Sequence, residues 1–208
     1  KNFPELCEEI YTVLDVILEY ESCDVDMLRI GNAIFEIASN NRFYSKLYAD
    51  LYANLIRKYE IMNTIFETTL TGFLTIFDNI ERAVAEEDYD KFCKINLDNE
   101  RRKALSSFFV NLTANKIITE DKLIDLTINL IMKVLDYLTK EGMKSEVDEI
   151  MENIAILYSK ELFAKNKNEI HDGKTFIQVI EMLARSKAKT FASLSNKTIF
   201  KCMDMVEM

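Results

Sequence analysis

The sequence predicts an all-α fold in which helices stack in pairs around one core. The 208 residues include only 4 Gly and 1 Pro, the residues that mark tight turns and hairpins most strongly. Apolar residues recur every three or four positions along most of the chain, which is typical of helices with one buried face. With 49% hydrophobic residues the chain can bury a sizeable core, so we expect one domain spanning residues 1–208.

Composition also limits the class of protein. The net charge of −9 makes the chain a poor general binder of nucleic acids or membrane surfaces, although a local basic patch can still serve. No signal peptide is visible, and no apolar run approaches the roughly 20 residues that span a bilayer. The scattered cysteines form no C-x-x-C pair, which favours reduced, mostly buried thiols and a cytoplasmic or nuclear location. They are Cys7, Cys23, Cys93 and Cys202.

A helix predicted from Asn41 to Tyr59 anchors this interpretation. Two apolar rows run along it at four-residue spacing, and they would stack into a broad face that needs neighbours on more than one side. Asn40 or Asn41 can cap its start by accepting a hydrogen bond from a free backbone N–H. The first row, which we expect in the core, is Phe43, Leu47, Leu51 and Leu55, and the second is Tyr44, Tyr48, Tyr52 and Ile56.

Further helices are predicted on both sides of this one. Before it, one helix begins at Pro4 and a second follows a cap at Asp24. After it, a fourth helix is predicted over residues 61–85, with Gly72 inside it as a mark of close packing. The acidic, weakly periodic stretch 86–99 is predicted to be a long loop, with room for a short turn of helix around Phe92.

The second half of the chain continues the helical pattern. A fifth helix is predicted from Glu100, a sixth and a seventh follow, and the polar stretch 165–174 is predicted to be a linker before two last helices. Side-chain caps are predicted at Thr119, at Ser145 (with Asp148 as a capping box) and at Ser195.

The predicted helix starts recur at intervals close to the 40–47 residues of HEAT or armadillo units, with one longer gap at the acidic loop. Stacked helix pairs of this size form a crescent in which each pair contacts its neighbours. The prediction is therefore an α-solenoid of about five HEAT-type helix pairs, the last of them incomplete. The first members of the pairs are expected to start at about Pro4, Phe43, Glu100, Ser145 and Ser195.

No residue pattern points to catalysis, a metal or a cofactor, and we expect none of them. His171, the single histidine, cannot build a nucleophilic triad or a multi-histidine metal site and is expected on the surface. No Gly-rich run precedes a helix to hold a phosphate. The late basic residues are either ordinary solvated charge or a local contact for RNA or an acidic partner. They are Lys174, Arg185, Lys187, Lys189, Lys197 and Lys201, with residues 100–103 as a second basic spot.

Four stretches resemble one family, the middle domain of eukaryotic translation initiation factor 4G, which is a HEAT-repeat domain. FYSKLYADLYANL from Phe43 resembles its second-repeat signature, and SSFFVNLTANKIITEDKLIDLTINLI from Ser106 resembles its third repeat. EIMENIAILYSKEL from Glu149 is similar to the fourth repeat, and LSNKTIFKCMDMVEM from Leu194 to the fifth. The pieces follow the family's order and cover nearly the whole chain.

Departures from the family pattern mark a divergent member. Ala104-Leu105 stands where the third repeat usually has Gly-Asn, Ile199 replaces a basic residue, and the Leu-Asn-x-Leu-Thr run expected before Phe3 is absent. Because the chain begins at Lys1 and ends on a helical pattern, we expect it to be a piece of a longer protein. Its Asn-, Ile- and Lys-rich composition suits an AT-rich genome, such as that of a protist or a large DNA virus.

The resemblance implies a scaffold and not an enzyme. In this family the domain binds both lobes of a DEAD-box RNA helicase of the factor 4A type and promotes its activity when mRNA is recruited to ribosomes. RNA binding is a second family property, and flanking sequence would carry any motif for a cap-binding protein. The residues carried over are Phe3, Asn41, Arg42 and Tyr44 at a first helicase-binding end, and Lys187, Lys189, Asn196 and Lys197 at a second end for helicase or RNA.

Alternatives remain open at this point. A related adaptor in mRNA decay, splicing or cap binding would share the fold, and so would an RNA-binding solenoid that binds no helicase. For single residues, packing explains Phe3 and Tyr44, and solubility explains the lysines, without any partner.

Overall fold

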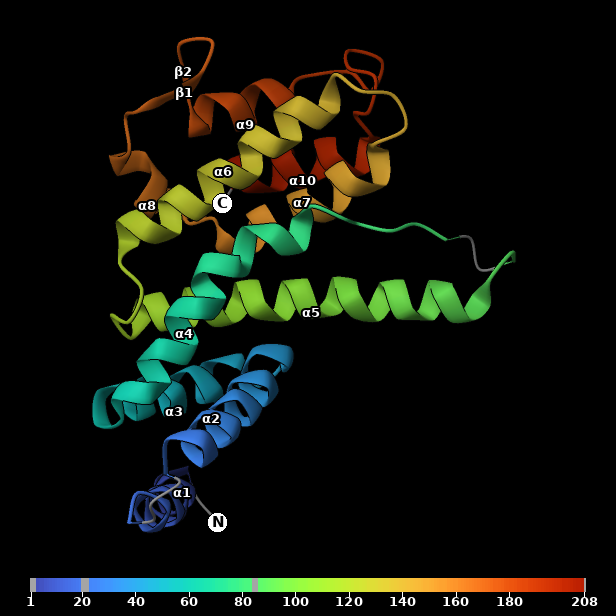
Figure 1. Cartoon of the computed structure of the whole chain (residues 1–208). Coiled ribbons are helices and arrows are strands. Elements are labelled where there is room, and N and C mark those ends of the chain that lie inside the picture. Colours follow the sequence, from blue (N-terminus) through green and yellow to red (C-terminus); the bar gives the residue numbers. More distant parts are fainter. Residues whose placement is uncertain (1–2, 20–22, 84–85, 208) are drawn as a thin grey trace.

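The computed structural model describes residues 3–19, 23–83 and 86–207, and these are mostly helical (Figure 1). A short 3₁₀ helix and a two-stranded antiparallel hairpin interrupt the α-helices. The elements in order are α1 (Phe3–Ile17), α2 (Cys23–Asn40), α3 (Ser45–Lys58), α4 (Glu60–Gly72), η1 (Phe73–Phe77), α5 (Tyr89–Ala114), α6 (Glu120–Leu138), α7 (Lys144–Leu157), α8 (Lys160–Lys165), β1 (Glu169–His171), β2 (Lys174–Thr175), α9 (Phe176–Ala184) and α10 (Asn196–Glu207).

The long helix α5 lies across the middle of the molecule (Figure 1). On one side it packs against α2 and α3, and on the other against α6 and α7. Helix α7 in turn packs against α6 and α10, and α9 packs against α10. Helix α4 packs on α2 and α3, and η1 after it reaches α6, so this segment connects the two sides of α5.

Two adjacent phenylalanines of α5 join the two halves of the core. Phe108 lies edge-on to Phe35 of α2 and Tyr52 of α3, with ring centroids 5.7 and 6.0 Å away. Phe109 lies against Phe73 of η1, 4.8 Å away. Both α5 rings are fully buried, and burial of one such side chain contributes roughly 1.5–3 kcal/mol. Their position makes α5 the central element of the described core.

The predicted loop over residues 86–99 is wrong, because most of it is the first half of α5. Asp88 caps this helix by accepting a hydrogen bond from the backbone N–H of Lys91 at 2.9 Å. The first helical residue is therefore Tyr89, and the predicted start at Glu100 is wrong. Most of the first two turns of this helix is exposed, and acidic and polar residues outnumber the apolar ones. Apolar spacing indicates a helix most clearly where a broad face is buried, so a largely exposed helix gives a weak signal.

The fourth helix is shorter than predicted. Helix α4 ends at Gly72, a single 3₁₀ helix follows, and residues 79–83 are not helical. Gly72 does not mark close packing, since a Cβ there would meet no atom within 4 Å. The close approach occurs instead at Gly31 of α2, where a Cβ would lie 2.5 Å from Cδ1 of Ile65 in α4.

Two of the predicted caps are confirmed and one is wrong. Thr119 accepts from the backbone N–H of Lys122 at 3.2 Å, and Ser195 accepts from that of Thr198 at 3.0 Å. Ser145 and Asp148 form no capping box, since Met143 precedes α7 without a side-chain cap. Asn41 accepts from the backbone N–H of Tyr44, in the turn just before α3 begins.

The predicted linker 165–174 is only partly correct, because it contains the end of α8 and the β1–β2 hairpin. The turn has Asp172 and Gly173 at positive φ, a conformation that glycine adopts without strain. Thr175 and Gln178 then form a full capping box at the start of α9. The side chain of Asp24, predicted as a cap for the second helix, lies outside the described residues.

Alanine substitutions at two glycines test this packing. Gly31→Ala must displace the buried side chains of Ile65 and Met62, and such overpacking costs about 1–3 kcal/mol, more than the roughly 1 kcal/mol that helix propensity returns. Gly72→Ala meets open space, so we expect it to leave stability unchanged or raise it by up to about 1 kcal/mol. Urea unfolding of both variants measures the difference, and a Gly31→Ala variant at least as stable as Gly72→Ala would contradict the close approach of α2 and α4.

Candidate protein-docking site

An apolar groove between α1 and α3 contains two of the residues predicted for the first end. Phe3 and Tyr44 lie on opposite walls of a cavity of about 320 Å³. Leu47 on α3 and Leu6 on α1, which also line it, are exposed apolar side chains. Exposed apolar surface that is gathered in a concave site is typical of a docking surface for another protein. The other lining residues are Cys7, Ile10, Tyr48 and Leu51.

Phe43, the residue before Tyr44, does not itself line this groove and is 86% exposed. Its ring lies edge-on to Tyr44, with centroids 4.8 Å apart. The prediction that Phe43 and Leu47 belong to the core is therefore wrong, whereas Leu51 and Leu55 are buried as predicted. The predicted row assumed that the helix begins at Asn41. Helix α3 begins only at Ser45, so helical spacing does not apply to Phe43.

The other two residues predicted for the first end have different positions. Asn41 holds the turn before α3 through its hydrogen bond to the backbone N–H of Tyr44, 3.1 Å long. Arg42 is exposed in the same turn. The structure thus brings Phe3 and Tyr44 together on one groove, while Asn41 shapes the adjacent turn and Arg42 offers a positive charge beside it.

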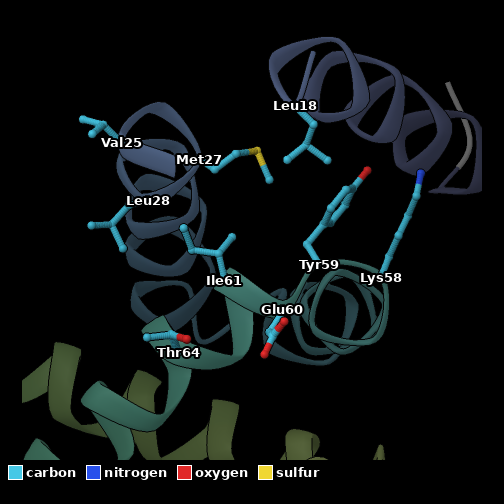
Figure 2. A pocket seen from close by; sticks show the side chains of 9 residues that line it. All are labelled: Leu18, Val25, Met27, Leu28, Lys58, Tyr59, Glu60, Ile61 and Thr64. Atoms are coloured by element: carbon cyan, nitrogen blue, oxygen red, sulfur yellow. The ribbon is translucent and has the colours of Figure 1, made fainter. Parts of the chain in front are cut away.

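A larger cavity of about 660 Å³ opens where α1, α2 and the α3–α4 junction meet (Figure 2). Apolar side chains such as Leu18, Met27 and Ile61 line most of it, and Lys58 and Tyr59 extend along one wall (Figure 2). Residue spacing did not indicate this cavity, since its walls come from three separate helices. Its remaining lining residues are Val25, Leu28, Glu60 and Thr64.

A polar cluster beside this cavity attaches α1 to α3. The Lys58 ammonium lies 2.7 Å from Asp15, and the Tyr59 hydroxyl donates to the same carboxylate at 2.7 Å. The hydrogen bond from Lys58, then that from Tyr59, lowers the pKa of Asp15. Burial and the Asp15 hydrogen bond raise the pKa of Tyr59. Lys58 also lies over the Tyr11 ring, 4.7 Å from its centroid, so α1 is positioned here by both charge and ring contacts.

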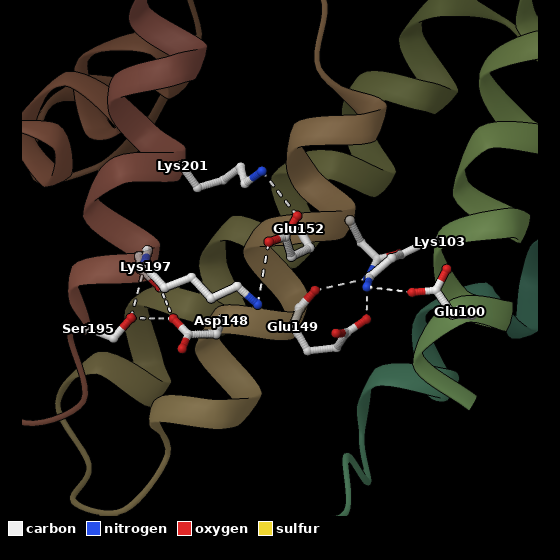
Figure 3. Close-up of polar contacts among 10 residues, drawn as sticks. Glu100, Lys103, Asp148, Glu149, Glu152, Ser195, Lys197 and Lys201 are labelled. Atoms are coloured by element: carbon white, nitrogen blue, oxygen red, sulfur yellow. Dashed lines mark hydrogen bonds and ion pairs between the residues drawn. The ribbon is translucent and has the colours of Figure 1, made fainter. Parts of the chain in front are cut away.

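At the second end, two lysines of α10 are committed to internal contacts. Lys197 and Lys201 converge on Glu152 of α7, at 3.4 and 3.1 Å (Figure 3). Burial raises the pKa of Glu152, but the contacts with Lys201 and Lys197 outweigh burial, and the pKa is lowered. Asp148 accepts hydrogen bonds from the hydroxyls of Ser195 and Thr198. These contacts attach α10 to α7, so Lys197 has a structural partner.

The remaining candidates of the second end are open to solvent. Lys187 and Lys189 are exposed in the link between α9 and α10, and neither has an ion pair among the described residues. Arg185, two residues earlier, lies 3.8 Å from Glu181. Asn196 is exposed as the first residue of α10. The predicted late basic cluster is thus divided, with the α9–α10 link as its free part.

The basic spot predicted at residues 100–103 is also used internally. Arg102 donates to the carbonyl oxygen of Ile76 at 2.9 Å, and Lys103 lies 3.0 Å from Glu100 (Figure 3). Arg102 thus holds α5 to the end of η1, whereas Lys103 and Glu100 pair within α5 and Arg101 lies 3.8 Å from Asp98 of the same helix. Each cation of this spot therefore has an internal partner.

A buried polar seam joins α5 to α7. The hydroxyl of Ser106 donates to Oδ1 of Asn153 at 2.9 Å, and Nδ2 of Asn153 donates to Glu149. Burial raises the pKa of Glu149, and the charge of Lys103 only partly offsets this effect. One turn earlier, Glu146 lies 3.3 Å from Arg82. The Ser106–Asn153 hydrogen bond fixes α5 against α7, and the Glu149 and Glu146 carboxylates of α7 are buried.

The arrangement offers docking surfaces and no reactive constellation within the part of the chain that the structure describes. His171 is half-buried in β1, with Nε2 3.2 Å from Asp172. No group of three or more His, Cys, Asp or Glu side chains gathers among the described residues as it would around a metal ion. None of the described helices is both long and apolar enough to span a membrane.

Comparisons with protein-family models, with curated proteins and with solved structures find no match to this chain. The family and its function consequently remain a proposal.

Substitutions along one apolar row separate the docking surface from the core. Phe43→Ala removes an exposed side chain, and we expect it to change the free energy of unfolding by less than about 0.5 kcal/mol. Leu55→Ala, three turns further along the same row, removes a fully buried side chain and should destabilise by about 2–5 kcal/mol. Chemical denaturation of both variants tests the contrast, and a Phe43→Ala loss as large as that of Leu55→Ala would place Phe43 in the core.

The seam predicts a pH effect. Because burial raises the pKa of Glu149 above its ordinary 4.5, the folded protein holds this proton more tightly than the unfolded chain. The contribution of protonated Glu149 to the free energy of unfolding is therefore present at acid pH and is lost as the pH rises through the pKa of the folded state. Glu149→Gln should therefore be more stable than the native chain at neutral pH, and this gain should vanish below about pH 4. The exposed Glu207→Gln is the control, and an equal pH profile for both variants would contradict the effect.

Proposed function

We propose that the chain is a non-enzymatic scaffold domain of the translation initiation factor 4G type. In this proposal it binds a DEAD-box RNA helicase of the factor 4A type and promotes its activity in the recruitment of mRNA to ribosomes. The observation that carries the proposal is the groove, where Phe3 and Tyr44, chosen from separate parts of the sequence, lie on opposite walls beside the exposed Phe43. The proposal includes a cytoplasmic location.

The order of the helix contacts supports a stack of helix pairs of the HEAT type. Helices α3, α5, α7 and α10 pack one on the next, as successive first members of pairs would. Helix α2 packs on α4, η1 reaches α6, and α6 and α9 each pack beside a member of that row. An α-solenoid needs such nearest-neighbour contacts. In this interpretation α1 begins the first pair, and α10 is the first member of an incomplete last pair.

The groove has the features of an energetically important contact. Binding energy at interfaces concentrates in a few residues, and aromatic side chains in pockets are enriched among them. Phe43 and Tyr44 extend from the turn that Asn41 holds in place, so they are presented without a large loss of conformational freedom. Full burial of Phe43 by a partner would contribute roughly 1.5–3 kcal/mol before the costs of association.

Two separate docking ends would explain an effect on helicase activity. The groove lies at the α1 end of the molecule and the α9–α10 link lies at the other end (Figure 1). A helicase with one lobe on each end would be bound best in one relative orientation of its lobes. A ligand shifts a conformational equilibrium only by the difference between its affinities for the two conformations. Each 1.4 kcal/mol of that difference changes the ratio of the two helicase conformations about tenfold.

A second candidate function is RNA binding by the free part of the basic cluster. Lys187 and Lys189 are exposed and have no ion pair among the described residues, and the exposed Arg185, which pairs with Glu181, lies two residues before Lys187. Phosphate binding by such residues weakens steeply as salt rises. Adaptors in mRNA decay, splicing or cap binding are further alternatives within the same fold, and the sequence that flanks this chain in its full-length protein would separate them.

Binding and activity assays with a factor-4A-type helicase test the leading proposal. We expect the chain to capture the helicase in a pull-down and to stimulate its RNA-dependent ATPase. The double variant Phe43→Ala, Tyr44→Ala should weaken capture by at least about tenfold, since it removes both exposed rings. Tyr89→Ala, which removes an exposed ring on α5 away from both proposed docking ends, is the control and should bind normally.

The second end is tested in the same assay. Lys187→Glu with Lys189→Glu should reduce stimulation more than capture, because one lobe would remain bound at the groove. Lys122→Glu with Lys144→Glu, at two exposed lysines on α6 and α7, is the charge-matched control. If the native chain neither captures the helicase nor stimulates its ATPase, the helicase proposal is ruled out. Salt-dependent RNA binding that the lysine variant abolishes would favour the RNA-binding alternative.

A further inference from the structure

The first half of α5 carries an exposed apolar stripe that none of the described elements covers. Tyr89 and Leu97 are 67% and 54% exposed, and Cys93 between them is also exposed. This half of α5 extends beyond the helices that pack on its second half (Figure 1). We propose that the stripe is a self-association surface, on which the same stripe of a second copy of this chain packs antiparallel.

The spacing of the stripe suits a two-fold axis. Residues four apart lie on the same helix face about 6 Å apart along the axis. The stripe therefore has Cys93 at its centre, with one large apolar residue a turn before it and one a turn after it. In an antiparallel pair with the axis at Cys93, Tyr89 of each copy packs on Leu97 of the other. A two-fold interface requires this reciprocity, in which each contact occurs twice.

The charges beside the stripe favour the same arrangement. Asp90 and Lys94 lie on one flank of the stripe, one turn apart, and both are exposed. A two-fold axis perpendicular to the helices brings this flank of one copy against the same flank of the other. Asp90 then lies beside Lys94 of the second copy, and the pair occurs twice. In a parallel dimer this flank would instead face the flank of Phe92 and Asn96, which offers no opposite charge.

Helix geometry allows close contact at the centre. Packed helices lie about 8–10 Å apart and their Cα atoms lie about 2.3 Å from each axis. The two Cys93 Cα atoms would therefore be about 4–5 Å apart, which overlaps the range of about 4.4–6.8 Å that a disulfide needs. A contact of two helices over three turns is smaller than stable interfaces of about 1,200–2,000 Å², so the dimer is a weak one that depends on concentration.

This association is independent of the proposed helicase function. Neither wall of the groove uses α5, and Lys187 and Lys189 lie in the α9–α10 link. Substitutions in the stripe therefore leave both proposed docking ends intact. A failure of the dimer would not affect the scaffold proposal, and the reverse also holds.

Cysteine cross-linking tests the arrangement. The probe is copper-phenanthroline in air, which takes one electron and one proton from each of two thiols as the S–S bond forms. In a Cys23→Ser chain, Cys93 should give a dimer on a non-reducing gel, since the thiols of Cys7 and Cys202 are buried. Two further chains share the substitutions Cys23→Ser and Cys93→Ser; one carries Tyr89→Cys and the other, which is tagged, carries Leu97→Cys. A mixture of these two chains should cross-link. Leu97→Cys alone should not, because its two copies would be about 12 Å apart along the axis.

Sedimentation velocity over a concentration series tests the charges. Asp90→Lys should weaken dimerisation about tenfold, because two attractive pairs become repulsive. The double variant Asp90→Lys, Lys94→Asp restores opposite charges across the axis and should recover the native dimerisation. Circular dichroism verifies that helix content is unchanged in each variant. A chain that is monomeric at every concentration, or that cross-links through Leu97→Cys alone as readily as in the mixture, would overturn the proposal.

Discussion

The structure depends on the burial of two neighbouring rings of α5 in two different directions. Phe108 packs against α2 and α3, and Phe109 packs against α4 and η1. Because adjacent positions on a helix are about 100° apart, a single helix can serve both groups of neighbours. The groove, the polar cluster at Asp15 and the cavity beside α2 all belong to helices that are held, directly or through α2 and α3, by this pair.

Polar contacts set which helices meet beyond that core. The Ser106–Asn153–Glu149 seam attaches α5 to α7, and Glu152 and Asp148 attach α7 to α10. Buried polar groups are costly unless they are hydrogen-bonded, so these contacts disfavour other pairings of similar apolar helices. The same contacts use several lysines that, by sequence alone, were candidates for a basic surface. Function is therefore proposed only for the charges that remain free, such as those of Lys187 and Lys189.

Several features could be predicted from sequence because their causes are local. The caps at Thr119 and Ser195 follow from a short hydroxyl side chain placed just before a helix. The candidate pair of Phe3 and Tyr44 came from a family resemblance, and the structure places both on one groove. The first half of α5 was missed because its apolar residues form only a narrow stripe among acidic and polar ones, although the cap at Asp88 was a local signal that could have indicated it.

The helical class, a large apolar core and most helix starts follow from the order of residues, since they depend on backbone propensity, on caps and on apolar spacing within one turn or two. The exposure of Phe43, the division of the basic cluster and the uncovered stripe of α5 do not. Each depends on which distant helix lies against a given face, and that choice is made by complementary packing across the whole core. The tertiary structure thus decided which apolar and charged side chains remain available to a partner.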